Sequence, residues 1–263
     1  MPAKERRDAI LQRIHADGYV EAKILSRELG VDASTIRRDL DTLVRSGKAE
    51  RTHGGARPVT GAAFEIPYAV KETARRQEKA AIAQCAAQKV LDGDTVILDS
   101  GSTTYQVALE LRHRTDLTII TNDLRIGKYV ATIPAIRLLV TGGELLGSVY
   151  TLVGERAVDF LSDYSADWAF LGADAIDPIA GITNTNTLEI PIKRAIIAAA
   201  TRTVVVADSS KLGHRALAKV AAIYEVDTIL TDSGLPIDQV KLYGDHVVRA
   251  LVTTNSHQNS TTT

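Results

Sequence analysis

One turn of the sequence combines glycine with several hydroxyl side chains, the residue types that bind anions. Residues 99–104 read Asp-Ser-Gly-Ser-Thr-Thr and stand between an apolar stretch, Thr95–Leu98, and a helical pattern. Such a turn binds anions because its backbone N–H groups point outward and the helix dipole favours negative charge. The spacing matches neither a P-loop nor a dinucleotide-binding glycine fingerprint. Taken alone, the turn can also be an ordinary helix N-cap.

Polar side chains follow four more apolar stretches, and others lie in the segment that leads into the helix carrying Lys193. If these stretches are parallel strands, their carboxyl ends meet at one edge of a sheet, where ligands bind. A shared pocket there explains the pattern better than separate turns do, and its content suits a small polyhydroxylated anion. The predicted ligand-binding residues are Asp99, Gly101, Ser102, Thr103, Thr104, Asn122, Gly143, Glu144, Asp174, Asn184, Glu189, Lys193 and Lys211.

Strands and helices alternate through this part of the chain. The nearly continuous, β-branched apolar stretches predict a parallel α/β sheet that is buried on both faces. The predicted strands are Thr95–Leu98, Leu117–Ile120, Ile136–Val140, Trp168–Leu171, Thr203–Ala207 and Thr228–Leu230. The predicted helices are Tyr68–Leu91, Thr103–Arg112, Leu124–Ala131, Glu155–Leu161, Leu188–Ala200 and one near Pro236–Tyr243.

A second set of residues whose side chains could bind a ligand lies near the N-terminus, where the pattern is that of a helix-turn-helix. Gly30 can end one helix in the left-handed conformation, and Asp32 can cap the next. Ile36, Leu40 and Leu43 form its buried stripe. The residues largely off that stripe can reach DNA bases and phosphates; they are Ser34, Thr35, Arg37 and Arg38. The alternative is an amphipathic surface helix with solvated arginines.

The flanking segments favour a winged helix. Helices are expected at about Lys4–Ala16 and Ala22–Leu29, and the alternation in Lys48–Arg57 predicts a β-hairpin wing. Arg51, His53 and Arg57 on this wing could contact phosphates. The first 58 residues carry a net charge of +3, against −1 for the whole chain, so the basic excess is local. A winged module that contacts protein remains the alternative.

The composition bounds the remaining choices. The chain of 263 residues has one cysteine, Cys85, and no apolar run that reaches the roughly 20 residues of a membrane span. These features predict a cytoplasmic protein with no membrane partner. We expect a DNA-binding domain at 1–57, a linker at 58–70, a ligand-binding domain at 71–252 and a disordered tail at 253–263. The six histidines are scattered, so neither a metal site nor a cofactor is expected.

The N-terminal segment resembles the DNA-binding domain of the DeoR family of bacterial transcription regulators. The resemblance lies in Arg7, in Leu11 or Ile14, and in the runs Thr35–Leu40 and His53–Ala56. Residues 71–232 are similar to the effector domain of the same family, in the family's order. The similar segments are Asp99–Thr104, Thr121–Asn122, Gly142–Gly143, Phe170–Asp174, Lys193–Arg194 and Asp208–Lys211.

This resemblance implies a sugar-phosphate isomerase-like fold that binds phosphorylated sugars or related metabolites. It also implies a homo-oligomer, dimer or tetramer, that binds an operator in double-stranded DNA, most often as a repressor. Two positions depart from the family pattern. Asp32 stands where Ser or Thr is usual, and Ala175 stands where Gly is usual.

The resulting hypothesis is that the protein is a transcription regulator of a carbohydrate-metabolism operon and that a phosphorylated sugar or related metabolite controls it. Regulators of this family are most often repressors, so we expect a repressor. The alternative is a sugar-phosphate isomerase-like enzyme, with general acid and base groups from Asp99, Asp174, Glu189 and Lys211. No arrangement of carboxylates and lysines in the sequence has diagnostic spacing, and we expect no enzymatic activity.

Overall fold

The computed structural model describes residues 2–17, 19–52, 54–57, 68–147 and 149–252. The chain divides into two compact units, residues 1–74 and 75–263, which are taken separately below. The predictions for His53, for residues 58–67 of the linker and for the tail lie outside the described residues. In the described part of the chain, no helix combines the length and the apolar character that a membrane span requires.

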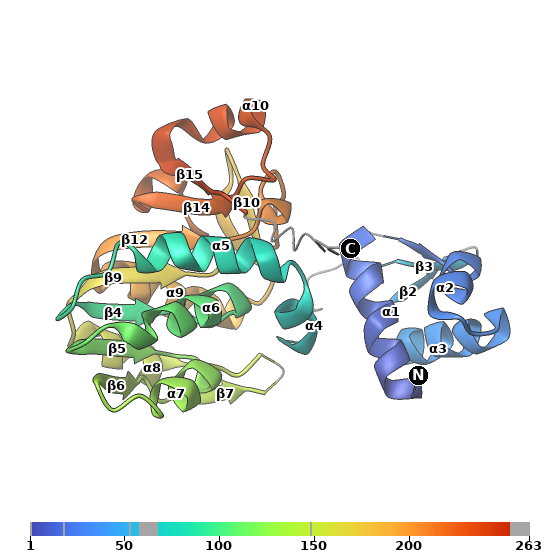
Figure 1. The fold of residues 1–263 in the computed structure, drawn as a ribbon, viewed down its shortest axis with the longest axis horizontal. Coiled ribbons are helices and arrows are strands. Elements are labelled where there is room, and N and C mark those ends of the chain that lie inside the picture. Colours follow the sequence, from blue (N-terminus) through green and yellow to red (C-terminus); the bar gives the residue numbers. More distant parts are fainter. Residues whose placement is uncertain (1, 18, 53, 58–67, 148, 253–263) are drawn as a thin grey trace, which may run out of the picture. The chain divides into compact units, whose positions relative to one another are not determined.

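The first unit is a winged helix-turn-helix. It contains α1 (Ala3–Asp17), β1 (Val20–Glu21), α2 (Ala22–Leu29), α3 (Ala33–Arg45), β2 (Glu50–Thr52) and β3 (Gly55–Arg57). The strands form a small antiparallel sheet in the order β1-β3-β2. Figure 1 labels β2 and β3 of this sheet and the three helices of the unit. The three predicted helices and the hairpin are confirmed. Their apolar faces meet in one core, which includes Ile10, Ile14, Leu25, Ile36, Leu40 and Ala56.

The turn between α2 and α3 has the predicted geometry. Gly30 is left-handed, with φ 63°, and its N–H donates to the Ser26 carbonyl. The Asp32 carboxylate accepts a hydrogen bond from the Ser34 N–H at 2.7 Å and so caps α3. This contact lowers the pKa of the Asp32 carboxyl, with Arg37 and Arg38 acting in the same direction. Asp32 therefore does the capping work expected of it.

An ion pair ties the first helix to the third. Arg6 on α1 places its Nε 2.6 Å from Oδ2 of Asp39 on α3. The two side chains are only 11% and 7% exposed, so the charges are largely shielded from water. Asp39 lies on the buried face of α3 beside Leu40 and Leu43, where an unpaired carboxylate would be costly.

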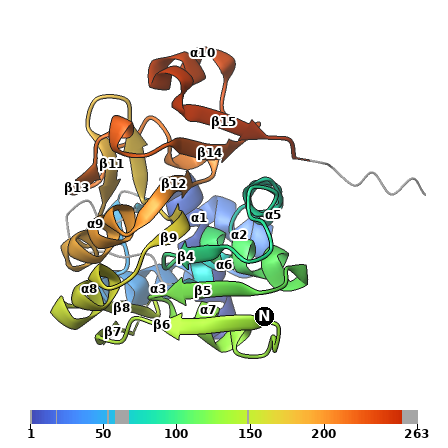
Figure 2. The same ribbon diagram turned by 90° about the vertical axis from the view of Figure 1, so that its left-hand side faces the viewer.

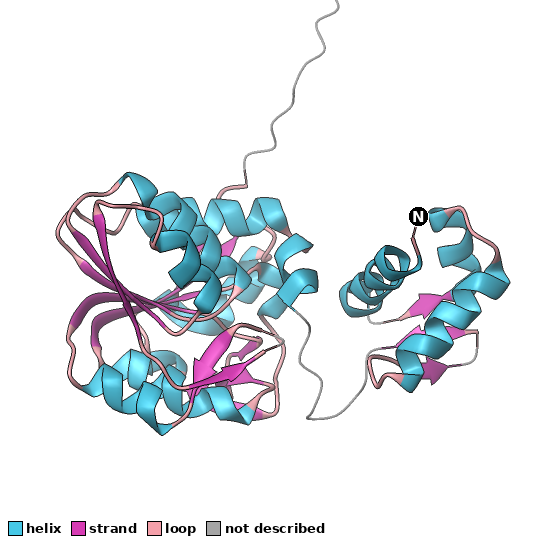
Figure 3. Ribbon diagram, turned by 90° about the horizontal axis from the view of Figure 1, so that it is seen from below, coloured by secondary structure: helices cyan, strands magenta, loops and turns pink. Residues whose placement is uncertain are grey.

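The second unit is built on a parallel sheet with strand order β15-β14-β12-β9-β4-β5-β6. Every neighbouring pair in it is parallel, which confirms the predicted fold class. Figure 2 shows the strands stacked in this order, and Figure 3 shows helices on both sides of the twisted sheet. The strands are β4 (Thr95–Leu98), β5 (Leu117–Thr121), β6 (Ile136–Val140), β9 (Ala166–Leu171), β12 (Ala200–Val206), β14 (Thr228–Asp232) and β15 (Val247–Ala250).

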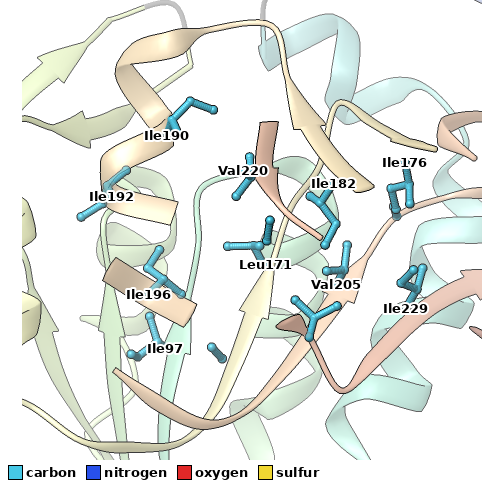
Figure 4. Close-up of a cluster of buried hydrophobic side chains, with 14 of the residues drawn as sticks. Ile97, Leu171, Ile176, Ile182, Ile190, Ile192, Ile196, Val205, Val220 and Ile229 are labelled. Carbon is cyan, nitrogen blue, oxygen red and sulfur yellow. The ribbon is translucent and has the colours of Figure 1, made fainter. Parts of the chain in front are cut away.

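Alternate residues of each strand point to opposite faces and build two cores. Val96, Leu98 and Ile119 pack in one core, with residues of α5 (Arg76–Ala87), α6 (Ser102–Glu110) and α7 (Leu124–Val130). Ile97 and Ile120 face the other core, with α8 (Glu155–Ser162) and α9 (Ile190–Ala198). Figure 4 shows part of this second core. Burial on both faces explains why the strands are almost continuously apolar.

Two smaller sheets were not predicted. β7 (Glu144–Leu146) and β8 (Thr151–Val153) form a hairpin, and β10 (Ala175–Asp177), β11 (Gly181–Asn184) and β13 (Ala218–Ala221) form an antiparallel sheet. The chain also contains the short helices η1 (Leu111–His113), η2 (Thr187–Glu189), η3 (Ser209–Lys211), η4 (Ile223–Glu225), α10 (Ile237–Val240) and η5 (Lys241–His246).

The single helix predicted for Tyr68–Leu91 is wrong. The structure has α4 (Tyr68–Thr73) and α5, separated at Arg75, whose φ of 51° is left-handed. A right-handed helix cannot run through a left-handed residue. Arg75 Nε lies 3.5 Å from Asp208 Oδ1, and Arg75 Nη1 lies 3.5 Å from Glu78 Oε1. The break coincides with the boundary between the two units.

The Arg6–Asp39 pair yields a test of the first unit's stability. Asp39→Ala leaves the Arg6 guanidinium shielded from water without this carboxylate, so we expect a loss of about 3 kcal/mol in the unit's free energy of unfolding. Urea unfolding followed by far-ultraviolet circular dichroism measures this loss. Trp168 is the only tryptophan and lies in the second unit, so its fluorescence transition should not move.

The matched control removes both charges. The double variant Arg6→Met with Asp39→Leu replaces the pair by apolar contact, and it should recover most of the stability lost in Asp39→Ala. Wild-type stability in Asp39→Ala would contradict a stabilising role for the pair.

Candidate functional site

The polar residues predicted from the strand ends do lie at one edge of the sheet. Leu98 of β4 is paired in register with Thr121 of β5 and with Phe170 of β9. The residues that follow these three therefore leave the sheet at the same level. We call the group Asp99, Asn122, Asp123, Gly172 and Asp174 the polar edge.

A buried lysine closes the polar edge from the side of α9. Lys193 Nζ lies 2.5 Å from Asp99 Oδ2 and donates to the Gly172 carbonyl at 3.0 Å. The Gly172 N–H donates to the same Asp99 oxygen at 2.9 Å. Burial acts to lower the pKa of Lys193, but the Asp99 and Glu189 carboxylates outweigh it, and the pKa lies above its ordinary value. The ammonium therefore stays charged inside the protein.

Three further predicted residues join this network. The Asn184 amide donates to Glu189 Oε2 at 2.7 Å, and its oxygen accepts from the Asp174 N–H at 3.3 Å. Asp174 Oδ2 in turn accepts from the Thr185 N–H at 2.9 Å. Glu189 Oε2 lies 4.0 Å from Lys193 Nζ. The structure thus brings together five predicted residues from four separate segments of the chain, namely Asp99, Asp174, Asn184, Glu189 and Lys193.

The glycine and hydroxyl turn forms the start of α6. Gly101 is the N-cap, with φ 154°, and Thr104 Oγ1 donates back to the Gly101 carbonyl at 2.9 Å. Ser102, Thr103 and Thr104 are all buried. Backbone N–H groups at such a helix start are suited to bind an anion.

Asp123, which is not among the predicted ligand-binding residues, contributes a carboxylate next to this turn. Its Oδ1 caps α7 by accepting from the N–H groups of Arg125 and Ile126, and its Oδ2 accepts from the Gly101 N–H at 3.3 Å. Burial raises the pKa of Asp123 against the opposing effect of these hydrogen bonds. An anion arriving at the Gly101 turn would therefore meet a carboxylate that resists ionisation.

The remaining predicted ligand residues lie apart from the Lys193 network in the contacts of the described residues. Gly143 allows close packing of the β7–β8 hairpin, because a Cβ there would lie 2.4 Å from the Val153 carbonyl oxygen. Glu144 is exposed at the start of β7. Lys211 is half-buried on η3, a turn that Asp208 caps through the Ser210 N–H.

Three residues near the site, Ser100, Asp123 and Thr151, are not among the predicted ligand-binding residues. Asp123 directly precedes a predicted helix, so its N-capping position could have revealed it. The Ser100 and Thr151 hydroxyls lie within 2.5 Å of each other. Thr151 belongs to a strand of three residues, which is too short to show a periodic pattern.

The candidate DNA-binding residues lie mostly on the outer side of the first unit. Ser34, Arg37 and Arg38 are exposed on α3, whereas Thr35 is half-buried. On the wing, Arg57 Nη2 lies 2.8 Å from Glu50 Oε2, and Arg51 Nε lies 3.6 Å from Asp41 Oδ1. Both wing arginines are therefore paired with carboxylates within the first unit.

Comparison with known proteins identifies both units. Residues 6–61 match the model of the DeoR-like helix-turn-helix domain, and residues 74–233 match that of the DeoR C terminal sensor domain. The glycerol-3-phosphate regulon repressor of Escherichia coli K12 is 30% identical over 249 residues, which are 95% of this chain and 98% of that protein. The HTH-type transcriptional regulator GlpR of Haloferax volcanii is 35% identical over 238 residues, or 90% and 92% of the two chains.

Solved structures resemble the chain more distantly. Ribose 5-phosphate isomerase A from Methanocaldococcus jannaschii is 23% identical, with a TM-score of 0.38 over 51% of this chain and 53% of that one. The family models and the full-length relatives, in contrast, cover both units. From its winged helix-turn-helix to its sensor domain, the chain belongs to the DeoR family of transcription regulators.

Proposed function

We propose that this regulator represses a carbohydrate-metabolism operon. We further propose that its affinity for DNA is controlled by a phosphorylated sugar or related metabolite that binds at the polar edge. The observation that carries the proposal is the Gly101 turn, a helix start without a side-chain cap, which follows the buried Lys193–Asp99 pair by two positions in the chain. One part suits a phosphate and the other suits hydroxyls. The E. coli relative's name, a glycerol-3-phosphate regulon repressor, points in the same direction.

Within this proposal, α3 enters the major groove of an operator. Ser34, Thr35, Arg37 and Arg38 contact bases and phosphates there, and the wing residues Arg51, His53 and Arg57 contact the backbone. One recognition helix reads only a few base pairs, so a homo-oligomer would bind repeated half-sites. Such a regulator works in the cytoplasm, where the DNA is. The names of both full-length relatives support regulation rather than catalysis.

In the second unit, the phosphate of the ligand binds at the turn formed by Gly101, Ser102, Thr103 and Thr104. The Lys193 network and Asn122 bind the remaining part of the ligand, and Gly143, Glu144 and Lys211 line the outer part of the site. The ligand must bind one DNA-binding state more tightly than the other, because a ligand with equal affinity for both shifts nothing.

Arg37 provides the test of DNA reading. If it pairs with a guanine, Arg37→Ala should weaken operator binding by about 1–3 kcal/mol. The operator can be selected from a random duplex library with the full-length protein, and affinities measured by fluorescence anisotropy. Arg45→Ala, in the last turn of the same helix, removes an equal charge and should have a smaller effect. Equal losses of operator affinity in the two variants would show that Arg37 acts only through its charge and does not pair with a guanine.

Gly101 provides the test of anion binding. A methyl group at this position would lie 3.3 Å from Thr104 Oγ1 on a backbone whose φ of 154° favours glycine. Gly101→Ala should therefore weaken binding of inorganic phosphate at least about tenfold, as measured by isothermal titration calorimetry. The control is Gly147→Ala, where a Cβ meets no atom within 4 Å. If Gly101→Ala binds phosphate as tightly as the wild type does, the anion does not bind at this turn.

Asp123 predicts a pH dependence. Because its pKa is raised in the folded protein, the folded state holds the proton more tightly than the unfolded state does. The stability that this proton contributes is present at low pH and is lost as the pH rises through the raised pKa. Bound phosphate also favours the neutral carboxyl, so phosphate affinity should fall over the same range.

The measurement is the ratio of phosphate affinities of wild type and Asp123→Asn at each pH. This ratio cancels the titration of phosphate itself and of groups common to both proteins. We expect it to decrease with rising pH across the raised pKa of Asp123. If this ratio of affinities does not change with pH, the ionisation of Asp123 does not affect phosphate binding.

A further inference from the structure

Three carboxylates belong to α3 and its N-cap, and they differ in their partners. Asp39 pairs with Arg6, and Asp41 Oδ1 lies 3.6 Å from Arg51 Nε. Asp32, which caps the helix, is exposed and makes no ion pair in the described part of the first unit. Two of the three negative charges are therefore paired with arginines of the same unit, and the charge at the start of the helix is not.

The Asp32 carboxylate is held in one orientation. Its Oδ1 accepts from the Ser34 N–H at 2.7 Å, and the Ser34 side chain also hydrogen-bonds to the carboxylate. These bonds, together with Arg37 and Arg38, lower the pKa of the Asp32 carboxyl, so the group is ionised at neutral pH. An ionised carboxylate has about four acceptor positions, so about half of them remain open after the contacts with Ser34.

The open acceptor positions lie at the start of α3. A recognition helix places its N-terminal residues against the edges of the bases. The exposed residues that follow on the helix are Ser34, Arg37 and Arg38, which are suited to contact DNA. An unpaired carboxylate among them weakens binding through repulsion by the phosphates, unless a donor on the DNA meets it.

We propose that Asp32 is a specificity-determining residue of the DNA-binding unit and that its carboxylate selects a cytosine in each operator half-site. This inference rests on the proposed function, since it assumes that α3 enters the major groove. The carboxylate accepts a hydrogen of the cytosine N4 amino group. Its effect is mainly on discrimination, because every other base leaves the negative charge less well matched.

Cytosine fits best among the four bases because a carboxylate can only accept hydrogen bonds. Guanine presents the acceptors N7 and O6 in the major groove, and thymine presents the acceptor O4 and a methyl group. Adenine offers its N6 amino group, but the N7 acceptor beside it repels the second carboxylate oxygen. Cytosine presents an amino donor and no acceptor in this groove.

The decisive variant is Asp32→Asn. An amide has one oxygen, and the cap requires it, because the Ser34 N–H can only donate. The amide nitrogen then takes the place of the open carboxylate oxygen, so that an acceptor becomes a donor. Asn caps helices about as well as Asp does, and the variant should therefore keep its fold. Cytosine, which lacks a major-groove acceptor, should change from the most favoured to the least favoured base.

The experiment selects operators from a random duplex library with the full-length wild type and with Asp32→Asn. Four duplexes that differ only in the base at the changed position are then compared by fluorescence anisotropy. We expect the wild type to bind the cytosine duplex at least about fivefold more tightly than the other three, and Asp32→Asn to bind it at least about twofold more weakly than the others.

Asp8→Asn is the matched control. It makes the same chemical change at another exposed aspartate of the first unit, on α1 instead of the helix-turn-helix. It should leave the order of the four bases as it is in the wild type. Asp32→Ser adds a second test, because Ser also caps the helix but its short side chain cannot reach the base. The cytosine preference should fall below about twofold in this variant.

The outcomes separate this inference from the proposed function. If the wild type selects no sequence, the DNA reading assigned in the proposed function fails. If it selects an operator and both Asp32 variants select the same bases at every position, Asp32 only caps the helix and the inference is overturned. The inference is also overturned if the base that changes is not a cytosine in the wild-type operator. Circular dichroism checks that the variants are folded, and Asp32→Ser decides the question if Asp32→Asn does not fold.

Discussion

The second unit depends on one buried ion pair. Lys193 and Asp99 are 94 positions apart in the chain, and their contact joins α9 to the end of β4. Neither charge would be tolerated alone in this interior, because an unpaired buried ion is far more costly than a lost hydrogen bond. Since Lys193 also binds the Gly172 carbonyl, the pair fixes three segments at once. The arrangement leaves the other carboxylate oxygen, Asp99 Oδ1, buried and without a hydrogen-bond partner among the described residues.

In both units, a largely buried ion pair joins segments that are distant in the chain. In the first unit, the pair of Arg6 and Asp39 joins α1 to α3, the helix that also carries Arg37. In each unit an aspartate also caps a helix, Asp32 on α3 and Asp123 on α7. A largely buried charge pair joins separate segments in each unit, and an aspartate fixes the start of a helix. Rigid support of this kind keeps binding groups in one geometry.

Much of this frame could be predicted from the sequence because its elements have strong local patterns. Gly30, Asp32 and the apolar stripe of α3 define the helix-turn-helix, and long β-branched stretches define the central strands. The strands of the small sheets have only two to four residues, so they show no periodicity. At the break, Arg75 contacts a distant carboxylate, Asp208, which no local pattern contains. The gathering of five polar residues at one edge followed from the parallel topology, whereas their individual bonds did not; their role in binding stays a prediction.

The break between α4 and α5 has a consequence of its own. A left-handed residue is usually glycine, but here it is Arg75, held in place by a carboxylate while its side chain remains 45% exposed. Dissolved salt screens a half-exposed ion pair of this kind much more than a buried one. Salt should therefore weaken the contact of Arg75 with Asp208, next to the boundary between the two units, more than it weakens the buried Lys193–Asp99 pair.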